Sequence, residues 1–108
     1  MPSTVETRRI APQLIDAATS VHANYRASCK ARTRAEFVAK MGIVAEEADE
    51  SEAWLAILLE LEIGATDDLQ SFRREAEELT SIFTASFHTS RDRLQGQKSN
   101  PKNRNPKN

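Results

Sequence analysis

Five basic side chains occur close together in one stretch of the chain and could bind phosphate groups. The stretch is "NYRASCKARTRAEFVAK", residues 24–40, and its single acidic residue is Glu36. Arg binds phosphate oxygens through paired N–H donors, and Lys contributes a compact positive charge. Such a cluster is the electrostatic signature of a nucleic-acid-binding surface. The candidates in this stretch are Arg26, Lys30, Arg32, Arg34 and Lys40.

An acidic run, "EEADESE" at residues 46–52, follows directly and raises the alternative of a metal site. Bundles that hold two metal ions use inward-facing Glu-x-x-His motifs. The chain has no such motif, and neither His22 nor His88 has an acidic partner at that spacing. We therefore expect no metal or other cofactor, and hydrogen bonding between helices or subunits by Glu47 and Asp49.

No arrangement of nucleophile, base and acid is recognisable, so the sequence does not predict an enzyme. Ser20, His22 and the acidic run form no triad, and Cys29 is the single cysteine, which excludes an internal disulfide. A lone cysteine on a helix is most often a small buried apolar residue, and this is expected for Cys29. The N-terminus lacks the apolar run of a signal peptide, and no segment approaches a membrane span. A cytoplasmic protein is expected.

The composition predicts a small all-α domain. The 108 residues contain 39% apolar and 29% charged residues, with only 3 Gly and 4 Pro. That is little material for the tight turns of a β-structure, whereas Ala, Glu, Arg and Leu favour helices. The predicted fold is an antiparallel up-and-down helical bundle with three clear helices in residues 1–95.

The first helix is expected at residues 13–31, with residues 3–12 left open because Pro12 would kink a longer helix. Asn24 lies beside its apolar stripe and is interpreted as a buried hydrogen-bonding residue. Tyr25 is expected in the core with its hydroxyl at the edge. The stripe consists of Leu14, Ala18, Val21, Tyr25 and Cys29.

The second helix is expected at residues 34–63. Thr33 and Glu36 form a capping box at its start, and Gly64 provides a left-handed stop. Its apolar residues alternate at spacings of four and three, which is typical of one helix face. They are Phe37, Met41, Val44, Ala48, Ser51, Leu55 and Leu58.

The third helix is expected to begin after Thr66 as its N-cap and to fade near Gly96. Residues 96–108 contain the repeat "NPKN" twice and no large apolar residue, so a disordered basic tail is expected. The apolar stripe of the third helix consists of Leu69, Phe72, Ala76, Leu79, Phe83, Phe87 and Leu94, with Ile82 beside it.

Antiparallel helices with short connections would separate the charges into two poles. Residues 1–40 carry 7 basic and 3 acidic residues, residues 41–78 carry 2 and 12, and residues 79–108 carry 6 and 1. Counting from the second turn places Arg91 and Arg93 level with Ala39 and Phe37, at the basic end. Solvated charges without a ligand, and head-to-tail pairing of opposite poles between subunits, are the alternatives. The predicted nucleic-acid-binding residues are Arg26, Lys30, Arg32, Arg34, Lys40, Arg91 and Arg93.

The central block resembles a bacterial family of four-helix-bundle proteins encoded in intervening sequences of large-subunit ribosomal RNA genes. The resemblance covers roughly residues 9–90. The accessory variability protein of diversity-generating retroelements belongs to the same superfamily as this family. The residues that carry it are Ser20-Val21, Asn24-Tyr25-Arg26, Arg32, Arg34, Glu36-Phe37, Gly42-Ile43-Val44, Glu46-Glu47-Ala48-Asp49-Glu50 and Trp54-Leu55.

The resemblance implies a homopentamer without enzymatic activity. In the retroelement branch, the assembly binds nucleic acid through a basic surface and engages a reverse transcriptase. The family pattern also has an amphipathic helix before "TSVHANYR", which here is missing or reduced to residues 3–12. Part of the apolar stripe would then be exposed unless a neighbouring chain covers it. A start assigned downstream of the real one, or a defective product, is the alternative.

The sequence therefore favours a non-enzymatic, homo-oligomeric bundle that binds structured RNA or DNA with little sequence specificity. A scaffold that engages a protein partner, without nucleic-acid binding, is the alternative. A reverse transcriptase is a candidate partner by family analogy, and no membrane association is expected.

Overall fold

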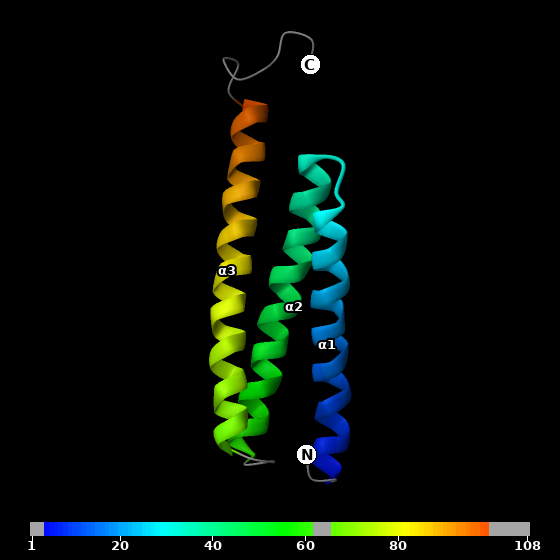
Figure 1. The fold of residues 1–108 in the computed structure, drawn as a ribbon, viewed down its shortest axis with the longest axis vertical. Helices are drawn as coiled ribbons and strands as arrows, with labels where there is room; N and C mark the ends of the chain where they lie inside the picture. Colours follow the sequence, from blue (N-terminus) through cyan, green and yellow to red (C-terminus); the bar gives the residue numbers. More distant parts are fainter. Residues whose placement is uncertain (1–3, 62–65, 100–108) are drawn as a thin grey trace.

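The protein folds as three antiparallel helices in the computed structural model, which describes residues 4–61 and 66–99. The helices are α1 (Val5–Cys29), α2 (Arg34–Glu60) and α3 (Thr66–Ser99). Figure 1 shows α1 and α3 running beside α2, with α3 extending past the turn between α1 and α2. The all-α, up-and-down prediction is confirmed. The expectations for Gly64 and for the tail after Ser99 fall outside the described residues.

Helix α1 begins at Val5, so it includes most of the segment that the sequence left open. The backbone N–H of Arg8 donates to the carbonyl oxygen of Thr4 at 3.0 Å. Pro12 lies inside the helix with an exposed side chain. A proline removes one helical hydrogen bond, but the exposed side chain of Pro12 does not occupy the buried face of α1. The helix therefore continues through Pro12 as one element in Figure 1.

Helix α2 begins at the predicted cap. The backbone N–H of Glu36 donates to Thr33 Oγ1 at 3.0 Å, and Thr33 has extended backbone angles. The carboxylate of Glu36 accepts from the N–H of Arg32 at 3.5 Å, one residue before the usual partner in a capping box. Because these contacts are local, four neighbouring residues were enough to predict this end. Helix α2 ends at Glu60, earlier than expected, and α3 includes Thr66 instead of following it.

The core lies on α2, the central helix. Val44 and Leu58 are fully buried, and Leu55 and Leu58 form a cluster with Leu69 of α3. Ile10 of α1 also packs against this cluster, so both outer helices contact the same face of α2. In the described residues the backbones of α1 and α3 pack on α2 and not on each other. Burial of apolar surface against α2 is therefore what joins the three helices.

Two residues expected in the core are exposed. Cys29 is exposed, and its neighbour Ser28 is buried instead and donates from Oγ to the carbonyl of Tyr25 at 2.6 Å. Tyr25 retains 46% of its surface. Both predictions were wrong; the ring of Tyr25 lies beside that of Phe83 of α3 instead of under α2. The apolar spacing was real, but α2 does not cover these side chains.

Asn24 makes the kind of hydrogen bond that was predicted, although within its own helix. Its Nδ2 donates to the carbonyl oxygen of Ser20 at 2.9 Å and lies 3.1 Å from Ser20 Oγ, and the side chain is half-buried. The Asn24 side chain therefore makes its hydrogen bonds within α1 and does not link two helices. Among the described residues, no helix is both long and apolar enough to cross a membrane.

Candidate nucleic-acid interface

The observed register brings the C-terminal half of α3 to the basic end of α2. A Cβ placed on Gly42 would lie 3.1 Å from Cε1 of Phe87, so these two residues are level with each other. One helical turn farther along α3, Arg91 is level with about Val38, next to the position predicted for it. The basic residues of α3 and those around the first turn therefore share one end of the bundle.

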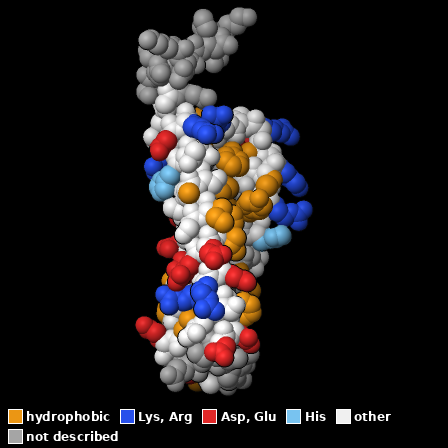
Figure 2. Space-filling view, turned by 60° about the vertical axis from the view of Figure 1, so that its left-hand side comes forward, with side chains coloured by type: hydrophobic (Ala, Val, Ile, Leu, Met, Phe, Trp, Pro, Cys, Tyr) orange, Lys and Arg blue, Asp and Glu red, His pale blue; other side chains and the backbone are white. Residues whose placement is uncertain are grey.

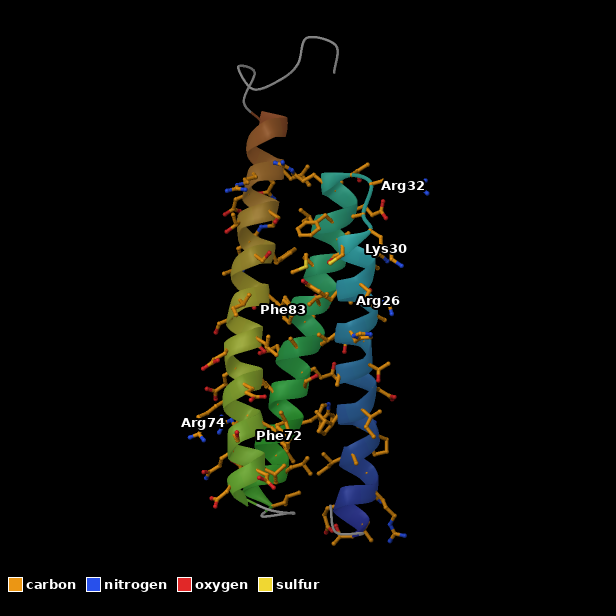
Figure 3. All side chains as sticks on the ribbon, in the orientation of Figure 1. Arg26, Lys30, Arg32, Phe72, Arg74 and Phe83 are labelled. Carbon is orange, nitrogen blue, oxygen red and sulfur yellow. The ribbon has the colours of Figure 1, made fainter. Side chains whose placement is uncertain are left out.

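Three of the predicted residues point to the same side of the molecule. Arg26, Lys30 and Arg32 extend outward from the C-terminal end of α1 and from the turn after it, away from α3 (Figure 3). All three are exposed, and Arg26 and Lys30 are one helical turn apart. We call these three residues the basic flank. Arg34, the first residue of α2, is also exposed.

The charges of the basic flank are not neutralised within the described part of the chain. The ion pairs found there are Arg73–Glu77 and Arg91–Asp92, and neither includes a flank residue. Glu36, the acidic residue in this stretch, uses its carboxylate on the backbone N–H of Arg32. An anionic ligand could therefore bind the flank without displacing an internal carboxylate.

The remaining predicted residues do not join the flank in one patch. The guanidinium of Arg91 lies 5.4 Å from the ring centre of Phe87 and 3.4 Å from a carboxylate oxygen of Asp92. Lys40 is half-buried, whereas Arg93 is exposed on α3. Because the flank points away from α3, Arg91 and Arg93 of α3 do not join it in one patch. The Phe87–Arg91 contact could have been anticipated from its spacing of four residues.

In the acidic run on α2, burial and neighbouring carboxylates raise the pKa of one acid. Burial and the neighbouring charges of Glu50 and Glu46 raise the pKa of Glu47. Trp54 Nε1 donates to Glu50 at 3.3 Å, and Ser51 Oγ donates to the carbonyl of Glu47 at 2.9 Å. No group of three potential ligands that could hold a metal ion is found among the described residues. Both of these hydrogen bonds join residues of α2.

An apolar groove, with a volume of about 240 Å³, runs between α1 and α3 over α2. Figure 2 shows hydrophobic side chains along this face, most of them in its upper half, where basic side chains border them; acidic side chains and a group of basic ones lie around the lower half. Phe72 and Phe83 point from α3 toward α1, and the ring centre of Phe83 lies 5.7 Å from that of Tyr25 (Figure 3). The groove is lined by Leu14, Ala18, Val21, Ala48, Ser51, Leu55, Phe72, Glu75, Ala76, Leu79, Thr80 and Phe83.

The comparison with known families agrees with this arrangement. Residues 1–85 match the family described as "23S rRNA-intervening sequence protein". The chain belongs to this family. Membership confirms the resemblance seen in the central block of the sequence, from Ser20 to Leu55. No curated protein matches the chain.

A solved structure similar to this family member is a crystal structure of a protein of unknown function from Bacteroides thetaiotaomicron, assigned to the S23 ribosomal protein family. The two chains are 28% identical, with a TM-score of 0.67. The match covers 73% of this chain and 70% of the other. The helical arrangement is therefore shared with this protein of the S23 ribosomal protein family.

Proposed function

We propose that this protein is a non-enzymatic homo-oligomer that binds structured RNA or DNA through its basic flank. The observation that carries the proposal is the arrangement of Arg26, Lys30 and Arg32, which are exposed, unpaired within the described residues and directed to one side. Arg34 extends the same charge across the turn. Lys40, which is half-buried, and Arg91, which contacts Phe87 and Asp92, contribute less to this binding. Arg93 adds positive charge from α3.

Phosphate contacts would dominate this binding. The guanidinium and ammonium groups of the basic flank would contact the phosphates of the nucleic acid, and such contacts carry little sequence information. Binding releases counterions, so the affinity should fall steeply as salt is added. Several copies in one assembly would present several flanks to one nucleic acid and raise the overall affinity. The resemblance to the retroelement proteins favours this reading and suggests a pentamer and a reverse transcriptase as assembly and partner.

A charge-reversal pair tests the proposal. Arg32→Glu with Arg34→Glu reverses one charge of the flank and the exposed charge next to it. Glu at the start of α2 suits the helix dipole. We expect the affinity for a labelled structured RNA to fall by about tenfold or more at low salt. The control is Arg8→Glu with Arg9→Glu, which makes the same charge change with two exposed residues at the other end of α1.

Equal losses in the two variants would contradict the proposal, because they would show attraction by total charge alone. The alternative function, a scaffold that engages a protein partner, predicts that neither variant changes RNA binding because the wild type does not bind. A flank variant that dissociates the assembly would show that Arg32 and Arg34 are interface residues.

A further inference from the structure

A histidine lies on the same face of α1 as the basic flank. His22 precedes Arg26 by four residues and Lys30 by eight, and residues at this spacing follow one face of a helix, one turn apart. The side chain of His22 is exposed, as are those of Arg26 and Lys30. In Figure 2 a histidine lies at the lower end of the basic side chains along the right-hand edge of the molecule. The flank is therefore continued, one helical turn farther along α1, by an ionisable side chain.

The packing of α1 leaves His22 available to a ligand. Ala17 and Ser28 are buried, with 2% exposure each, so they lie on the side of α1 that packs on α2. At about 100° per residue, His22 lies about 140° around the helix from Ala17 and about 120° from Ser28. Within the described part of the chain its side chain has no hydrogen-bond or ion-pair partner. A phosphate could therefore reach the imidazole without displacing an internal contact.

The charged groups near His22 come from α1 itself and from α2, the helix that packs on α1 in the described structure. On α1 the charged neighbour is Arg26, one turn away. Val21 and Ala48 line the same groove, so His22 is level with about Glu47 of α2. These acids do not lie between His22 and a ligand on the flank, because His22 is turned away from the side of α1 that α2 covers. The charged residues of α2 within about one helical turn of that level are Glu46, Glu47, Asp49 and Glu50.

An imidazole changes its charge in a pH range where the phosphates of a nucleic acid keep theirs. The ordinary pKa of a histidine side chain is about 6.5. In the protonated form both ring nitrogens carry hydrogen, which gives one positive charge and two N–H donors for phosphate oxygens. In the neutral form the charge and one of the donors are lost. A histidine at the end of the flank would therefore add a phosphate contact in mildly acidic solution and lose it in mildly alkaline solution.

We propose that His22 is a further phosphate-contacting residue of the basic flank, and that it makes nucleic-acid binding stronger in mildly acidic solution. Protonated His22 adds one positive charge to those of Arg26, Lys30 and Arg32. Because the nucleic acid binds the protonated form more tightly, formation of the complex near neutral pH takes up protons. This inference rests on the proposed function, since it names a further contact and a pH response of that same surface.

A titration at two pH values tests the inference. The affinity of the full chain for a labelled RNA hairpin is measured at about pH 6 and about pH 8, at several salt concentrations. This range spans the ordinary pKa of histidine and stays above that of Glu, about 4.3, so most carboxylates keep their charge. We expect the wild type to bind about fivefold more tightly at about pH 6 in about 0.1 M salt. The slope of the logarithm of affinity against that of salt should steepen by about 0.9, the value of one phosphate contact.

Two substitutions at His22 separate its charge from its packing. His22→Gln should bind like the wild type at about pH 8 and lose the gain at about pH 6. His22→Arg, which is always charged, should bind at about pH 8 as tightly as the wild type does at about pH 6. The matched control is His88→Gln, which removes the other histidine, an exposed residue on α3, and should keep the gain. Circular dichroism checks that all the variants stay helical.

The outcomes distinguish this inference from the proposed function. Equal wild-type affinity at the two pH values, or a His22→Gln variant that keeps the full gain, would overturn the role of His22. Binding at about pH 8 would in that case still support the basic flank. A folded wild type that binds at neither pH would overturn both. Loss of the gain in His88→Gln instead of His22→Gln would assign the pH response to α3 and contradict the inference.

Discussion

Helix α2 and the open side of α3 both carry apolar residues at helical spacing, yet they differ in what covers them. Val44 and Leu58 of α2 are fully buried, whereas Leu79 and Ile82 of α3 keep half or more of their surface. The difference follows from the number of neighbours, because within the described part of the chain α2 has a helix on each side and α3 packs on α2 alone. Spacing shows which residues share a face, and tertiary neighbours decide whether that face is a core or a binding surface.

The largest effect should come from truncating the covered stripe. Leu58→Ala removes a fully buried side chain, and we expect a loss of about 2–5 kcal/mol in the free energy of unfolding. Leu79→Ala should cost a small fraction of that in the monomer, because half of the Leu79 side chain already contacts solvent. Urea unfolding at dilute protein concentration measures both changes. Equal losses in these matched Leu variants would show that the two stripes do not differ as described.

A smaller effect is expected at Thr80, where the covered and open faces meet. Its Oγ1 is buried and has no hydrogen-bond partner among the described residues, which is unfavourable because the hydroxyl has left water without compensation. Thr80→Val replaces the hydroxyl by a methyl group of similar shape and keeps the branched side chain. We expect the free energy of unfolding to increase by about 1 kcal/mol. A decrease would mean that the hydroxyl has a hydrogen-bond partner in solution.

The smallest effect should appear at Glu47, a half-buried acid on α2. Its pKa is raised by burial and by Glu50 and Glu46, so the ionised form is less favourable in the folded chain than in the unfolded chain. The cost is fully present above the raised pKa and disappears as the pH falls below the ordinary value for Glu. Glu47→Gln should therefore raise the melting temperature slightly near pH 7 and leave it unchanged near pH 3. A gain of equal size at both pH values would assign the effect to packing.

The helices could be predicted where the determining contacts are local. The hydrogen bonds between Thr33, Glu36 and Arg32 lie within a few residues, and the start of α2 was predicted correctly. Pro12 was harder to interpret, because a proline inside a helical pattern can end the helix, kink it or be accommodated. The burial of Cys29 and Tyr25 was predicted wrongly, because a sequence stripe does not show that the facing position is open.

The candidate interface could be predicted by residue type and only partly by geometry. The clustering of Arg26, Lys30 and Arg32 was visible in the sequence, and the antiparallel register placed Arg91 and Arg93 at the same end. The direction of each side chain was not visible, so the separation of the flank from α3 had to come from the structure. The groove was anticipated as an exposed stripe, but its walls and floor depend on how three helices pack.

The central claim, that the basic flank binds nucleic acid through phosphates, is tested most directly by one titration. The affinity of the full chain for a labelled structured RNA is measured at several salt concentrations, with the assembly size recorded in the same buffers. We predict that the logarithm of the association constant falls linearly with the logarithm of salt concentration, with a slope that counts the phosphates contacted. A folded chain that does not bind at low salt would contradict the claim and leave the scaffold function as the better account.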